Sequence, residues 1–65
     1  MTTPIVRYML DQAVKAAYES DKAAMAGDTR SDLIAQGRQD AFTEGLAWAM
    51  GQPKAQAASH VLGAM

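Results

Sequence analysis

Apolar side chains recur at helical spacing along most of the chain, and glycines interrupt the pattern twice. From Pro4 to Ala26 they return every three or four positions, as on one face of a helix. Thr3 is suited to cap this helix and Pro4 to occupy its first position, while Gly27 supplies the left-handed residue that commonly ends a helix. The pattern therefore predicts a helix over about 4–26. Its apolar face comprises Val6, Met9, Leu10, Ala13, Val14, Ala17 and Ala24.

The remaining pattern predicts two further helices. One spans about 31–50, with Thr29 or Ser31 as its cap, and it holds the only Trp and the only Phe of the chain. Gly51 ends it, and a short helix over about 53–62 follows. The first two helices have similar lengths and a short polar turn between them, which favours an antiparallel helical hairpin. The short helix must dock on something to persist, on its own chain or on a neighbour. We expect an all-α domain.

A row of small residues indicates how the two long helices pack. Gly37, Ala41, Gly45 and Ala49 recur at every fourth position of the second helix. An interior glycine costs a helix about 0.5–1 kcal/mol relative to alanine, so its retention suggests a compensating close approach of another helix. We expect this strip to contact small residues of the first helix. These are Ala13 and Ala17.

The same geometry predicts one ion pair between the helices. If the turn centres between Asp28 and Thr29, facing residues have numbers that sum to about 57. Asp21 lies within the apolar stripe of the first helix and Arg38 within that of the second, and this register brings them close. We expect them to pair, which would fix the register more than it would add stability. The alternative is that both side chains extend past the contact into water.

The chain is short for a self-sufficient core. It has 65 residues, and fourteen of its apolar residues are alanine, which buries little area. Cysteine is absent, so no disulfide can compensate. The apolar surface of the second helix is too wide for one neighbouring helix to cover. We therefore expect a second copy of the chain to cover the remainder, so that dimerisation completes the fold. The predicted partner surface comprises Ile34, Phe42, Leu46, Trp48 and Met50. Alternatively, these residues form ordinary core beneath the third helix.

The charge distribution and the lack of targeting signals restrict the types of partner and the location that we expect. Six Lys and Arg balance seven Asp and Glu without a basic block, so binding to nucleic acid or anionic lipid is not expected. The longest apolar run, from Gly45 to Gly51, is far shorter than the ~20 residues of a membrane span. The first residues lack the basic and apolar regions of a signal peptide. We expect a cytoplasmic protein whose partner is another protein. High alanine without asparagine suggests a bacterial or phage source.

The sequence offers little chemistry. His60 is the only histidine, and without cysteine it could bind a metal only together with carboxylates or another chain. Ser59 adjoins it, but adjacent residues of a helix point about 100° apart and do not form a nucleophile and base. The acidic residues near the turn lack the spacing of a calcium loop, and no phosphate-binding loop is present. We expect no catalytic residue, metal or cofactor.

Three functions remain as hypotheses. The first is a small non-enzymatic interaction module that forms a homodimer and binds or modulates a larger protein, as a phage or bacterial accessory or inhibitor factor does. The second is a structural subunit of a virion or scaffold, which would associate without limit. The third is a DNA-associated regulator, whose affinity would fall steeply with salt. Few side chains of the second helix could read DNA, so nucleic acid is the least favoured partner.

Overall fold

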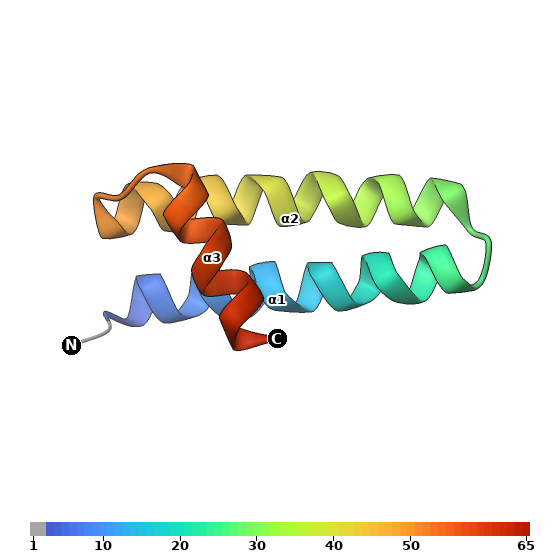
Figure 1. The fold of residues 1–65 in the computed structure, drawn as a ribbon, viewed down its shortest axis with the longest axis horizontal. Coiled ribbons are helices and arrows are strands. Elements are labelled where there is room, and N and C mark those ends of the chain that lie inside the picture. Colours follow the sequence, from blue (N-terminus) through green and yellow to red (C-terminus); the bar gives the residue numbers. More distant parts are fainter. Residues whose placement is uncertain (1–2) are drawn as a thin grey trace.

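The computed structural model describes residues 3–65, which form three helices (Figure 1). Helix α1 spans Pro4–Met25, α2 spans Thr29–Met50 and α3 spans Lys54–Ala64. The predicted all-α class is confirmed. Each end lies within two residues of the predicted one, which is the precision that helix boundaries allow.

Short polar side chains begin the two long helices. Thr3 accepts a hydrogen bond from the backbone N–H of Val6 at 3.2 Å, as expected of the cap of α1. Helix α2 begins earlier than predicted, because Asp28 is its cap and accepts the backbone N–H of Ser31 at 3.1 Å. The assignment of this cap to Thr29 or Ser31 was therefore wrong. A carboxylate at this position also interacts favourably with the helix dipole.

Two glycines end the long helices. Gly27 and Gly51 have φ angles of 73° and 64°, in the left-handed region that side chains with a Cβ rarely adopt. The backbone N–H of Gly51 and that of Gln52 bond back to the last turn of α2. Both stops follow the sequence prediction, because the geometry of a helix end is a local property of the chain.

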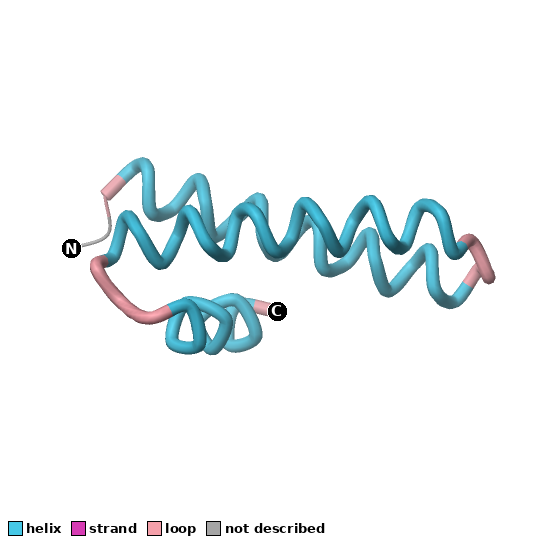
Figure 2. Tube along the Cα trace, turned by 90° about the horizontal axis from the view of Figure 1, so that it is seen from above, coloured by secondary structure: helices cyan, strands magenta, loops and turns pink. Residues whose placement is uncertain are grey.

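Helices α1 and α2 lie side by side and run in opposite directions, and α3 crosses them on one side (Figures 1 and 2). The described molecule measures 38 × 16 × 16 Å. It is therefore a rod whose length is that of the paired helices. Helix α3 covers the end of the rod near the start of α1, and the opposite end consists of α1, α2 and their turn (Figure 1).

The apolar core lies where all three helices meet. Leu46 and Val61 are the largest fully buried side chains, and Ala13, Ala47 and Ala57 are buried around them. Partly buried side chains extend this cluster along the same end of the rod. They are Val6, Met9, Leu10, Val14, Phe42 and Met50. Because α3 contributes Ala57 and Val61, its docking on its own chain completes the core.

The end of the rod near the turn is held by short side chains. Ala16, Ala17 and Ala35 are buried there, and the hydroxyl of Ser20 donates to Asp32 Oδ1 across the two helices at 2.5 Å. Such side chains allow close helix contact but bury little apolar area. The rod therefore has a larger apolar core at one end than at the other.

The strip of small residues does not face α1. Gly37, Ala41 and Ala49 are exposed, and only Gly45 is half-buried, beside the sulfur of Met9. Side chains four residues apart differ in direction by about 40° around a helix. A row at this spacing therefore winds around the helix, and its members cannot all contact one straight partner helix. The inward-facing side chains of α2 recur on average about every 3.5 residues, a spacing that keeps them facing a neighbouring helix along its length. One row of its buried and half-buried residues at this spacing is Asp32, Ala35, Gln39, Phe42 and Leu46, and Thr43, Gly45, Ala47 and Met50 are buried or half-buried beside that row.

The close-packing prediction was thus half wrong. Ala13 and Ala17 are buried between the helices as expected, but Ala35 and Ala47 of α2 are the small residues buried with them. The exposed side of α2 carries most of the strip instead. Its glycines do not serve the contact between α1 and α2, except that Gly45 leaves room for Met9.

The predicted ion pair was also wrong in one member. Arg38 Nη2 pairs with Glu19 Oε2, and Asp21 is exposed. The numbers of the observed partners sum to 57, as the predicted register requires. Asp21 lies two residues further along α1 than Glu19 and points about 200° around the helix from it, so it faces away from Arg38. Both partners of the Arg38–Glu19 pair are about half exposed, so the pair contributes little to stability.

Candidate functional site

The side of α2 that faces away from α1 carries an apolar surface. Trp48 is 85% exposed and Ile34 is 56% exposed, and Gly37 and Ala41 are exposed between them. Ile34, Ala41 and Trp48 are seven residues apart, which is close to two helical turns, so they lie along one line. We call these four residues the outer face of α2.

The predicted partner surface is therefore divided between two environments. Ile34 and Trp48 are exposed as that hypothesis requires, but Leu46 is fully buried, and Phe42 and Met50 are partly buried against the core. Two positions along a helix turn a side chain by about 200°, so Leu46 and Trp48 point in nearly opposite directions. The alternative interpretation, ordinary core, is correct for Leu46.

Two further apolar side chains lie at the surface of α1. Ile5 and Tyr8 are both more than half exposed, and the ring of Tyr8 meets that of Phe42 edge to face with centroids 6.2 Å apart. This geometry is a favourable one for aromatic pairs. Tyr8 therefore covers Phe42 on one side, a contact that the sequence analysis did not predict.

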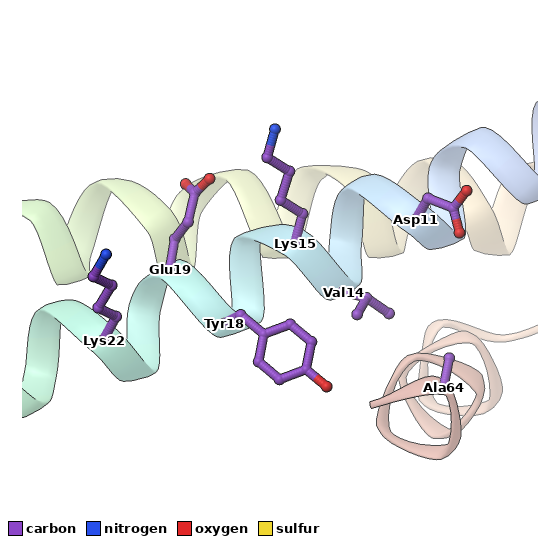
Figure 3. Close-up of a pocket in the computed structure, with 7 residues that line it drawn as sticks. All are labelled: Asp11, Val14, Lys15, Tyr18, Glu19, Lys22 and Ala64. Atoms are coloured by element: carbon purple, nitrogen blue, oxygen red, sulfur yellow. The ribbon is translucent and has the colours of Figure 1, made fainter.

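A shallow groove runs between α1 and the end of α3 (Figure 3). Val14 and Tyr18 point toward α3, whose Ala64 lines the groove (Figure 3). The hydroxyl of Tyr18 donates a hydrogen bond to the backbone oxygen of Met65 at 2.9 Å. Charges of both signs alternate along the α1 side of the groove. They belong to Asp11, Lys15, Glu19 and Lys22. An alternating row offers no selective site for an anion or a cation.

Two charged groups have shifted pKa values, and both have a structural cause. The hydroxyl and the backbone N–H of Ser31 hold the pKa of Asp28 below its ordinary value, because both stabilise the carboxylate at the start of α2. The carboxylate of Asp40 raises the pKa of Lys54, and Glu44 adds a smaller effect. These groups cap a helix and join α2 to α3, so their shifts report structure rather than catalysis.

The side chains that could take part in metal binding or nucleophilic chemistry lie apart in the described structure. Among residues 3–65, no group of three or more His, Cys, Asp or Glu side chains could hold a metal ion. His60 and Ser59 are exposed on α3. Over the same residues, none of the helices combines the length and the apolarity needed to cross a bilayer.

The sequence reading missed one polar contact between the helices. The carboxylate of Asp32 accepts hydrogen bonds from Ser20 and from the side-chain amide of Gln36. Ser20 lies three residues after Ala17, on the buried side of α1, and this spacing could have indicated its position. The Ser20–Asp32 bond is partly buried and joins α1 to α2, so it has a structural role, and the outer face of α2 remains the strongest candidate for a functional surface.

Comparison with known proteins gives no relative for this chain. No protein-family model, curated protein or solved structure matches it.

Proposed function

We propose that this chain is a small, non-enzymatic protein-interaction module that self-associates and binds a larger protein. The observation that supports the proposal is the number of large apolar side chains at its surface. Nine of them are exposed in the described chain: Ile5, Tyr8, Tyr18, Met25, Leu33, Ile34, Trp48, Leu62 and Met65.

More large apolar side chains are exposed at the surface than are buried in the core, and this difference favours association with a partner. Among residues 3–65, only Leu46 and Val61 are both large and fully buried, whereas Trp48, which has the largest side chain, is 85% exposed. Burial of a large aromatic side chain is worth about 1.5–3 kcal/mol, and tryptophan is enriched among the residues that dominate binding interfaces. A partner that covers Trp48 would therefore stabilise both itself and this small domain.

The composition and the net charge support a protein as the partner. A net charge of −1 without a basic cluster favours a protein over nucleic acid or a membrane surface. We propose a cytoplasmic role in a bacterium or its phage, as an accessory or inhibitor factor that acts by occupying a surface of its target.

A structural subunit of a virion or scaffold is the second candidate. The exposed apolar residues belong to all three helices, for example Met25 of α1, Trp48 of α2 and Leu62 of α3. Contacts between two different patches are heterologous and can continue without closing. Such a subunit would grow into open-ended assemblies with concentration, whereas the interaction module would stop at a defined size.

Sedimentation velocity over a wide concentration range tests the self-association, and affinity capture tests the target. We expect the wild-type chain to reach a plateau at a small oligomer, and to retain a cellular protein that the Trp48→Lys variant fails to retain. Ala55→Lys is the control, because it adds the same charge at an exposed position of α3 and leaves Trp48 in place. The proposal is contradicted if the wild-type chain remains a strict monomer and captures the same proteins as the Trp48→Lys variant.

A further inference from the structure

We propose that the outer face of α2 is covered by the same face of a second copy, with the two α2 helices antiparallel and crossing at Ala41. This inference rests on the proposed self-association and names the surface that performs it. Three features of the face carry the argument: the symmetry of its side-chain sizes, its accessibility and the state of the charges beside it.

Side-chain size along the face is symmetric about Ala41. Ile34 and Trp48 each lie seven residues from Ala41, about 10 Å along the axis on either side, and Gly37 lies four residues before it. Gly45 lies four residues after Ala41, at the edge of the face, where it is half-buried beside Met9 of α1. In an antiparallel pair related by a two-fold axis at Ala41, positions whose numbers sum to about 82 face each other. Ile34 then meets Trp48 of the other copy at both ends, and small residues meet at the centre.

This order of sizes suits two crossing helices. Crossing helices approach most closely at one point and diverge on both sides of it. The small residues stand at the crossing point, where there is least room, and the bulky Ile34 and Trp48 stand where the helices separate. A two-fold axis satisfies both ends with one sequence, whereas a foreign helix would have to carry a matching pattern of its own.

The face is free on its own chain. A Cβ added to Gly37 would meet no atom within 4 Å, and Ala41 is exposed. Helices α1 and α3 pack on the sides of α2 that hold Leu46 and Ala47, so neither competes for the outer face. A second copy can therefore dock without displacing any part of the fold.

The charges that flank the face already have partners. Arg38 pairs with Glu19, and Glu44 is close enough to Lys54 to affect its pKa. With the axis at Ala41, Arg38 and Glu44 have numbers that sum to 82, so Arg38 of one copy lies level with Glu44 of the other. The two copies therefore bring opposite charges to the same level of the contact, and each charge lies about 9 Å along the axis from its like counterpart.

The size of the face predicts a weak dimer. A tryptophan can bury about 150–250 Å², so two copies that cover Trp48, Ile34 and the residues between them bury on the order of 1,000 Å² in total. Specific interfaces of this size lie at the low end of the observed range. We expect association in the micromolar range or weaker, with rapid exchange.

Disulfide trapping tests the crossing point, since the chain contains no cysteine of its own. An Ala41→Cys variant places two thiols at the two-fold axis. Ala55→Cys is the matched control, because Ala55 is also an exposed alanine, on α3. Under mild oxidation at equal concentration we expect Ala41→Cys to form covalent dimers about ten-fold or more faster than Ala55→Cys, because the dimer holds the two thiols close together. Circular dichroism of both variants checks that the fold is retained.

Equal rates for the two variants would overturn the inference. If the wild-type chain still self-associates in the ultracentrifuge, only the α2 surface is wrong and another face forms the contact. If the wild-type chain also remains a monomer at millimolar concentration, the self-association in the proposed function is wrong as well.

Discussion

Leu46 and Trp48 are two residues apart in one helix and have opposite environments, 0% and 85% exposed. Truncating Leu46 to alanine leaves a cavity among Ala13, Ala57 and Val61, and we expect it to lower the free energy of unfolding by about 2–5 kcal/mol. The exposed Trp48 loses no contact in the monomer, so Trp48→Ala should change that free energy by less than about 0.5 kcal/mol.

Urea unfolding at low protein concentration, followed by circular dichroism, measures both variants. The expected order is a large loss for Leu46→Ala and almost none for Trp48→Ala. Similar losses for the two variants would mean that Trp48 belongs to the core of the monomer and that α2 is rotated from the orientation described above.

The two glycines inside α2 make a second contrast between residues. A Cβ at Gly37 would meet nothing, so Gly37→Ala should raise the free energy of unfolding by about 0.5–1 kcal/mol through helix propensity alone. A Cβ at Gly45 would lie 3.1 Å from the sulfur of Met9, which must then shift. We expect Gly45→Ala to be clearly less stabilising than Gly37→Ala. Thermal unfolding of both variants decides the order, and a larger gain for Gly45→Ala would contradict the contact.

Among the elements, α3 depends most on its neighbours. It has 11 residues, which is too short for a stable helix in isolation, and it is held by Ala57 and Val61. Val61 is 1% exposed whereas the adjacent Leu62 is 69% exposed. We expect Val61→Asp to release α3 and to lower both helicity and stability strongly, because a buried carboxylate has no partner there.

Leu62→Asp is the matched control for α3, since it introduces the same charge one position away on the exposed side. Circular dichroism and amide hydrogen exchange should show α3 intact in this variant and lost in Val61→Asp. Comparable losses in both variants would show that α3 does not dock through the face that contains Val61.

The sequence predicted these elements well because their ends are local. Thr3, Gly27 and Gly51 act through bonds within one turn of their own helix, so they could be identified without knowledge of the fold. The start of α2 was misplaced because Asp28, Thr29 and Ser31 are all competent caps, and only the path of the turn selects Asp28. Helix orientation about its own axis was harder, since it depends on the partner.

The candidate site shows most clearly that the orientation of a helix about its axis is hard to predict from sequence. The outer face of α2 contains two residues of the predicted partner surface, Ile34 and Trp48, and two of the predicted close-packing strip, Gly37 and Ala41. The sequence identified these residues but assigned them to two different contacts. Which side of α2 faces α1 is decided by the whole set of apolar contacts around Leu46, and no short motif carries that information.

At the scale of the whole molecule, the rod has a core at one end and exposed apolar side chains along its length. A domain of 65 residues gains little stability from such a core, and association adds to it in proportion to the logarithm of concentration. The proposed dimer and the stability of the fold are therefore linked, and both should increase together as the protein is concentrated.

The fluorescence of Trp48, the only tryptophan, tests the central claim most directly, because the claim is that this side chain is in water in the monomer and covered by a second copy in the dimer. The emission maximum is recorded from dilute to concentrated protein, beside the Ala41→Arg variant, in which two charges would meet at the crossing point. We predict the emission of a solvated indole at low concentration, a shift to shorter wavelength as the wild-type protein is concentrated, and no shift for Ala41→Arg. A short-wavelength maximum already in dilute solution, or the same solvated emission at every concentration, would contradict the account.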